Sequence, residues 1–254
     1  MEEGLQRILI ETGEISRFTA RFFRELFRRG HEFAEMLRQC FFLGYKSLGL
    51  VMTTGFIIGL VITIQSRPTL VQFGAEAWLP GMISVSLVRE IVPVVTALIC
   101  AGKIGSGIGA ELGSMKVTEQ IDAMDVSGTN PFKFLVVTRV FATTLMVPLL
   151  VVFADGVALY GGYLGVNIRG AVSWNLYWAQ VLDSLSFGDI VPSIAKTFFF
   201  GFAIGLVSCY KGYTTQRGTE GVGRSANAAV VISSLLVFIL DLIAVQLTDL
   251  LQLT

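Results

Sequence analysis

Residues 47–66 form a run of 20 amino acids without a charged side chain, and this run limits the chain to few folds. An apolar stretch of about 20 residues is what an α-helix needs to cross the hydrocarbon core of a bilayer. Four further apolar stretches are long enough to cross: residues 78–109, 135–166, 190–210 and 226–247. Only 15% of the residues are charged, against about 25% in soluble domains. The sequence therefore predicts an all-α integral membrane protein with five transmembrane helices.

The segment before the first span has helical periodicity and a basic face. Apolar residues recur at helical spacing between residues 5 and 38. The basic stripe consists of Arg17, Arg21, Arg24 and Arg28. Such a helix lies along an anionic membrane surface, although an ordinary packed amphipathic helix shows the same pattern. We expect residues 1–40 to form an amphipathic interfacial segment, divided near Gly30, and residues 41–254 to form the transmembrane domain.

The distribution of basic residues predicts the orientation of the chain. With the N-terminus in the cytoplasm, fifteen of the nineteen Lys and Arg residues fall in cytoplasmic segments. Cytoplasmic loops of membrane proteins carry such an excess. Five spans then place the C-terminus outside. Residues 169–187, which are amphipathic and rich in Trp and Tyr, fall on the extracytoplasmic side, where aromatic residues favour the membrane interface.

A short polar segment separates the second and third spans. Residues 116–127 predict a cytoplasmic helix of about three turns that is capped near Thr118 and ends at Gly128. Its polar side chains include Glu119, Gln120, Asp122 and Asp125. A short helix presented to the cytoplasm suits docking to another protein, and an ordinary solvated connector is the competing interpretation.

No pattern in the sequence indicates catalysis, metal binding or nucleotide binding. The single histidine, His31, and the cysteines Cys40, Cys100 and Cys209 share no metal-binding spacing. The glycines of residues 101–114 do not follow the dinucleotide-binding fingerprint, so close helix packing explains them better. Because the chain has no P-loop motif, any ATPase must be a separate polypeptide. We expect no catalytic residue, no metal, no bound cofactor and no nucleic-acid partner for this chain.

Ionisable side chains also lie inside the predicted spans, where a charge is costly and points to function by default. They are Arg89, Glu90, Asp155, Lys196 and Asp241. Successive helical residues point about 100° apart, so Arg89 and Glu90 need not pair with each other. Two interpretations of Arg89 and Glu90 remain open: they form a functional polar site, or they form ion pairs that fix helix packing. For Asp155, Lys196 and Asp241 we expect structural pairing, and Lys196 could also snorkel to the outer interface.

One long stretch resembles a known family. Residues 87–139, with LVREIVP at their start and GAELGSMKVTEQIDAMDVSGTNP further on, look like the MlaE/YrbE permeases. These are the membrane subunits of bacterial ABC transporters that work with MCE-domain proteins in lipid trafficking. The resemblance extends over nearly the whole chain, including the amphipathic N-terminus and the GYTT loop before the last span.

The resemblance implies an assembly and a location. It implies a homodimer in the bacterial inner membrane, with the N-terminus cytoplasmic and the C-terminus periplasmic. It implies a cytoplasmic ABC ATPase, which carries ATP and Mg, under each permease and a hexameric MCE protein above. The segment at residues 116–127 would be the coupling helix, centred on Glu119 and Gln120, that inserts into a cleft of the ATPase.

The resemblance also implies an outward-opening lipid cavity between the two permeases. Arg89 would there meet a lipid phosphate, and Glu90 would shape the polar part of the cavity. Gln65, near the end of the first span, could line it as well.

The implied function is movement of phospholipid or a related hydrophobic molecule between the inner membrane and an MCE protein. ATP is hydrolysed by the partner chain, so this chain would be a transport subunit and not an enzyme. Three alternatives remain open: an ion-coupled secondary transporter that uses the intramembrane charges as a relay, a passive membrane anchor of a lipid-trafficking assembly, and a membrane enzyme acting on lipids. No internal repeat supports the first, and no Ser or Cys has a base nearby in sequence for the third.

Overall fold

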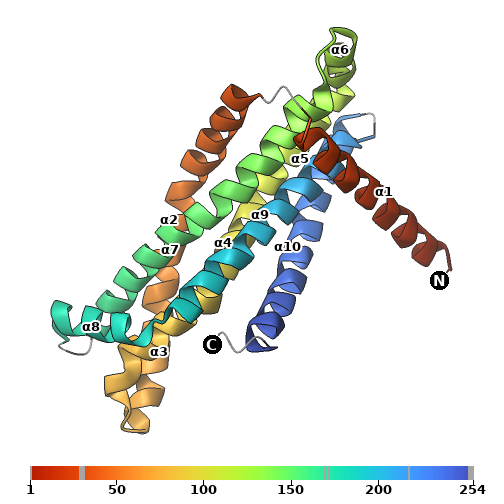
Figure 1. Ribbon diagram of the computed structural model, residues 1–254. Coiled ribbons are helices and arrows are strands. Elements are labelled where there is room, and N and C mark those ends of the chain that lie inside the picture. The colour runs from red at the N-terminus through yellow and green to blue at the C-terminus, as the bar shows by residue number, and fades with distance from the viewer. Residues whose placement is uncertain (1, 29–31, 169, 171, 217, 251–254) are drawn as a thin grey trace.

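The computed structural model is a bundle of long helices joined by short connections (Figure 1). It describes residues 2–28, 32–168, 170, 172–216 and 218–250, with side chains from residue 12 onward. No strand occurs within these ranges. The predicted break at Gly30 and the single histidine, His31, lie outside the described residues. Among the described residues, five helical segments are long and apolar enough to cross a membrane, which confirms the predicted all-α membrane fold.

The helical segments follow the predicted order. The chain begins with α1 (Glu2–Leu26), and the first span is α2 (Phe33–Gln72). The second span joins six segments end to end: η1 (Glu76–Trp78), α3 (Leu79–Ser86), η2 (Leu87–Ile91), α4 (Val92–Cys100), η3 (Ala101–Gly105) and α5 (Ser106–Val117). The other segments are α6 (Gln120–Val126), η4 (Phe132–Val137), α7 (Thr138–Asn167), α8 (Trp174–Ser184), α9 (Phe187–Tyr213) and α10 (Thr219–Leu250).

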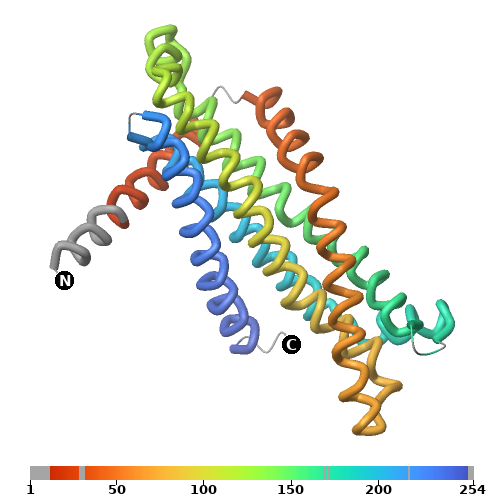
Figure 2. The backbone as a smooth tube through the Cα atoms, turned by 180° about the vertical axis from the view of Figure 1, so that it is seen from behind, coloured from red at the N-terminus to blue at the C-terminus, as the bar shows by residue number. Residues whose placement is uncertain are grey.

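The spans pack side by side, with α7 between α2 and α9 and with α10 against α9 and α5. Figures 1 and 2 show α2 and α10 at opposite edges of the bundle. α1 crosses the end of the bundle near α6 and then extends away from it, whereas α3 and α8 lie at the other end. The two ends therefore carry different short helices, and the charged site described below lies between them.

Glycines allow α2 and α7 to approach closely. A Cβ atom at Gly55 would lie 2.9 Å from the carbonyl oxygen of Ala154, and one at Gly59 would overlap the carbonyl oxygen of Ala158. The two glycines are four residues apart and therefore lie on one face of α2. The close contact that a GxxxG pair permits is present here.

The first span is longer than its apolar core. α2 begins at Phe33, so the boundary predicted between residues 40 and 41 falls inside a continuous helix. α2 also continues through Pro68 to Gln72. Transmembrane helices tolerate proline because neighbouring groups satisfy the freed carbonyl. The amphipathic segment thus runs directly into the membrane span without a break at residue 40.

Candidate functional site

Charged side chains from η2, α9 and α10 meet inside the bundle. Lys196 Nζ lies 2.6 Å from Glu90 Oε2 and 2.8 Å from Asp241 Oδ1. Arg89 Nη1 lies 3.7 Å from Asp189 Oδ1. We call these five residues the charge cluster. It joins four of the ionisable residues predicted to be intramembrane with Asp189, which sequence reasoning missed.

Lys196 does not snorkel to the interface. Its side chain is only 6% exposed and is held between two carboxylates. Burying a lone ammonium group in hydrocarbon has a large free-energy cost, but two carboxylates at hydrogen-bonding distance offset much of that cost. The pairing predicted for Lys196 and Asp241 is therefore present, and Glu90 takes part in it.

A proline explains why the helix changes register beside the cluster. η2 is a π-helical turn in which the Val92 N–H donates to the carbonyl of Leu87 instead of that of Val88. The next N–H that could reach the Val88 carbonyl belongs to residue 93, but Pro93 has none. The hydroxyl of Ser193 on α9 donates to this carbonyl over 2.6 Å. The π turn is thus tied to α9 next to the charge cluster.

Asp189 has one oxygen for helix capping and one for the cluster. Its Oδ2 accepts hydrogen bonds from the backbone N–H and the hydroxyl of Ser186, at 3.0 and 2.7 Å. This is a capping box at the start of α9. The predicted fourth span starts at Ile190, whereas α9 starts at Phe187, about one turn earlier. The Ser-x-x-Asp spacing of residues 186–189 is the signal that would have found both the helix start and Asp189.

Gln65 does not lie within the charge cluster. It is exposed and lines a separate hollow of about 370 Å³ between α2 and α3. Ser86 lines the same hollow, and Arg89 and Glu90 follow three and four positions later, about one helical turn on. The apolar lining residues are Ile62, Leu70, Met82 and Ile83. The predicted lipid-contacting residues thus divide into a charged part and an adjoining, uncharged part that is half apolar.

Asp155 lies apart from the cluster. Its Oδ1 on α7 is buried and has no hydrogen-bond partner among the described residues. Within the same part of the chain, no ion pair or hydrogen bond joins it to the charge cluster. The structural pairing predicted for Asp155 is therefore not seen there.

The predicted docking helix is shorter than expected. α6 has 7 residues, and Glu119 separates it from α5 by adopting a left-handed conformation with φ 59°. Thr118 does not cap α6, because its hydroxyl donates back to the carbonyl of Ser114 in α5. The chain therefore turns sharply at Glu119 instead of entering a helix of about three turns.

The end of α6 matches the prediction. Gly128 has a positive φ of 82°, which favours glycine. Its N–H donates to the carbonyl of Asp125, and the N–H of Thr129 donates to the carbonyl of Met124. These two bonds form a Schellman motif, which ends the helix.

α6 projects beyond the ends of the neighbouring helices (Figure 1). Ile121 is buried and anchors it, and Lys116 Nζ lies 2.9 Å from Asp122 Oδ1. Several side chains remain exposed, and Val126 is 91% exposed. The exposed polar residues are Glu119, Gln120, Asp122 and Asp125. α6 thus presents a small surface with one large apolar side chain among polar ones.

Sequence reasoning missed how α1 is held against the bundle. Asn130 Nδ2 donates to Glu25 Oε2 over 3.0 Å, just after α6. The guanidinium of Arg21 lies 4.2 Å from the centre of the Phe132 ring, which is a cation–π contact. These pairs are more than 100 residues apart in the chain, so no local pattern could have indicated them. They connect α1 to the segment that carries α6.

Comparisons with known proteins agree with these features. The family model described as permease MlaE matches residues 36–247. A probable ABC transporter permease protein of Rickettsia bellii is 34% identical over 241 residues, which cover 95% of this chain and 93% of that protein. The intermembrane phospholipid transport system permease protein MlaE of Haemophilus influenzae is 33% identical over 213 residues, covering 83% and 81%. The chloroplastic protein TRIGALACTOSYLDIACYLGLYCEROL 1 of Arabidopsis thaliana is 34% identical over 200 residues, covering 79% and 57%.

Proposed function

The chain belongs to the MlaE permease family, and we propose that it is the permease subunit of an ABC transporter that moves phospholipid. The lipid would pass between the inner membrane and an MCE-domain protein, driven by ATP hydrolysis on a separate subunit. The relative named for intermembrane phospholipid transport supports the substrate class. The charge cluster and its adjoining hollow support it from the chemistry of this chain.

The strongest support for this proposal is that Arg89 keeps hydrogen-bond donors for a ligand. Lys196 is engaged by two carboxylates at 2.6 and 2.8 Å, whereas Arg89 stands 3.7 Å from Asp189 and is 33% exposed. Of the two cations in the cluster, Arg89 therefore keeps donors for a ligand. Its planar fork can give two parallel hydrogen bonds to a phosphate, which a lysine cannot do. A lipid phosphate is an anion of the required shape.

The hollow between α2 and α3 suits the rest of the lipid. It begins about one helical turn from Arg89, and its lining combines four apolar side chains with four polar ones, which include Gln65. In ligand sites, apolar walls hold the apolar part of an amphiphile while polar groups fix its orientation. We infer that the phosphate meets Arg89 while the neighbouring apolar part of the lipid lies along this hollow. Glu90 would orient Lys196 and limit the space beside the phosphate.

α6 supports a cytoplasmic ATPase partner. It projects from the bundle, is closed by a Schellman motif and exposes Val126 beside polar residues. A few side chains that fill pockets of the partner supply most of the energy of an interface. The excess of basic residues in the segments at this end supports its cytoplasmic location. We infer that Glu119, Gln120, Asp125 and Val126 contact the ATPase, with Asp122 held by Lys116.

The exposed edge of α10 supports a homodimer. Its exposed apolar side chains include Val231, Leu235, Phe238 and Leu242. Glu90 and Asp241 of the charge cluster are only partly covered within one chain. A second copy packed near α10 would cover both the apolar face and the cluster. The MCE-domain protein would then lie over the opposite end of the bundle from α6.

The experiment that tests this proposal is lipid analysis of the purified chain. We expect the wild-type chain, extracted in mild detergent with its co-expressed ATPase, to retain phospholipid, as measured by mass spectrometry. Arg89→Ala should lose most of this lipid and keep the ATPase. Arg224→Ala, which removes an exposed arginine in a polar segment, should keep both. Unchanged lipid in Arg89→Ala would show that Arg89 has a structural role and that the site lies elsewhere.

A further inference from the structure

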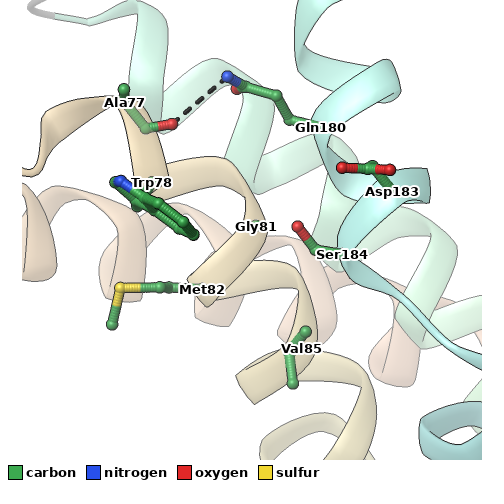
Figure 3. A pocket seen from close by; sticks show the side chains of 8 residues that line it. All are labelled: Ala77, Trp78, Gly81, Met82, Val85, Gln180, Asp183 and Ser184. Atoms are coloured by element: carbon green, nitrogen blue, oxygen red, sulfur yellow. Dashed lines mark hydrogen bonds between the residues drawn. The ribbon is translucent and has the colours of Figure 1, made fainter.

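A hollow of about 630 Å³ lies between α3 and α8, apart from the charge cluster (Figure 3). Two contacts fix the distance between its walls. Gln180 Nε2 donates to the carbonyl of Ala77 over 3.3 Å. Farther along, α3 and α8 meet where Gly81 leaves room for Ser184, because a Cβ atom at Gly81 would overlap the Ser184 hydroxyl. The hollow is therefore formed by two helices in direct contact.

The α8 wall is anchored to α7. Tyr177 and Val181 are fully buried on the side of α8 that faces the bundle. The Tyr177 hydroxyl donates to the carbonyl of Leu159 over 2.9 Å. Burial raises the pKa of the Tyr177 phenol, so it stays protonated as a donor. The opposite side of α8, which carries the lining residues, is thus held in a fixed orientation.

A carboxylate without a partner lies in this wall. Asp183 makes no ion pair or hydrogen bond to any other residue in the described part of the chain. Figure 3 shows it between Gln180 and Ser184 on the α8 wall of the hollow. The Gln180 amide oxygen and the Ser184 hydroxyl can also accept hydrogen bonds. One carboxylate with two neutral acceptors suits a primary ammonium, which has three donors.

The α3 wall offers apolar contacts. Trp78, the last residue of η1 before α3, is 72% exposed, and Met82 and Val85 continue this wall along α3. An indole ring attracts an ammonium through its face, and tryptophan favours the membrane interface. Met82 also lines the hollow between α2 and α3, so the two hollows meet at this side chain. An amphiphile with an ammonium headgroup matches both walls.

We propose that the hollow between α3 and α8 binds the headgroup of an ethanolamine phospholipid, with its ammonium at Asp183 and its glycerol and upper acyl region against Trp78, Met82 and Val85. The apolar wall, which belongs to a membrane-spanning segment, favours a lipid over a basic side chain of a partner protein. Binding here needs neither ATP nor transport. The site therefore stands apart from the proposed transport function.

The test measures which headgroup the chain retains. The purified chain is placed in nanodiscs with equal amounts of phosphatidylethanolamine and phosphatidylglycerol that have the same acyl chains, and native mass spectrometry counts the lipids that stay bound. We expect the wild-type chain to prefer phosphatidylethanolamine by about fivefold, the size of one partly exposed charge-assisted interaction. Asp183→Asn keeps the side-chain shape and should lower the preference to about one. Both lipids carry the phosphate that we assign to Arg89. Binding at Arg89 therefore does not distinguish phosphatidylethanolamine from phosphatidylglycerol.

The matched control is Asp249→Asn, which removes an exposed carboxylate of α10 that does not line the hollow. It should keep the wild-type preference. Glycerophosphoethanolamine, which lacks acyl chains, should compete weakly because it gains no contact with Met82 and Val85. Equal retention of the two lipids by the wild-type chain, or an unchanged preference in Asp183→Asn, would overturn the proposal. The proposal would also be overturned if equimolar glycerophosphoethanolamine displaced all of the bound phosphatidylethanolamine. Loss of a bound partner protein from Asp183→Asn, with the lipid preference unchanged, would overturn it as well.

Discussion

Lys196 donates to both Glu90 and Asp241, so three helical segments depend on one ammonium group. Each carboxylate in this arrangement would be an uncompensated charge in an apolar environment without the lysine. Removing one partner of a buried ion pair costs more than the pair itself contributes, because the remaining charge stays buried. At the scale of single residues, Lys196 therefore holds the structure together, and Arg89 keeps the donors that the proposed phosphate site requires.

Lys196→Met tests this division of roles. We expect it to lower the stability of the chain by about 3 kcal/mol, because Glu90 and Asp241 lose their shared cation. The measurement is the midpoint of thermal unfolding in detergent. The matched control, Lys116→Met, removes a partly exposed cation that pairs with Asp122, and such pairs contribute little. Equal shifts of the midpoint in the two variants would contradict the account.

At the scale of helices, the sequence predicted those elements that depend on local composition. An apolar run of about 20 residues is a local signal, so all five spans were found. Gly128 was found for the same reason, because a positive φ at a helix end favours glycine. The GxxxG pair at Gly55 and Gly59 also lies at a close helix contact.

Features that depend on distant parts of the chain were not predictable. The π turn of η2 leaves the Val88 carbonyl to the hydroxyl of Ser193, which lies 105 residues further along the chain. The pair of Lys196 and Glu90 spans 106 residues. Glu119 adopts a left-handed conformation, which is rare for a residue other than glycine, and no pattern in the sequence indicated it. The candidate site was therefore predicted as a set of residues, but its arrangement came from packing.

Val126→Asp tests α6 as the element that contacts the ATPase. Because Val126 is 91% exposed, the substitution should leave thermal unfolding of the chain unchanged. It should lower the co-purified ATPase to less than about a tenth, the effect of losing one apolar anchor of an interface. Thr219→Asp, which adds an exposed carboxylate at the start of α10, should keep the ATPase bound. Full recovery of the ATPase with Val126→Asp would assign the contact to another surface.

At the scale of the whole molecule, the two ends of the bundle have different chemistry. One end carries α1 and α6, and Asn130, just after α6, donates to Glu25 of α1; the other end carries α3 and α8. The charge cluster connects α9 and α10 with the second span, which reaches from one end to the other. Motion imposed on α6 would reach the cluster through the turn at Glu119 and then along the continuous second span. This arrangement fits the proposed transporter driven from the cytoplasm.

Lipid transfer by the reconstituted complex tests most directly whether this chain moves phospholipid in a process driven by ATP. The chain, its co-expressed ATPase and the proposed MCE-domain partner are placed in liposomes with fluorescent phospholipid, and the exchange of that lipid with the MCE-domain protein is followed. We predict that exchange requires ATP and falls to the background rate with Arg89→Ala, while the ATPase stays bound. Exchange that proceeds without ATP and follows an imposed ion gradient would contradict this claim and favour a secondary transporter.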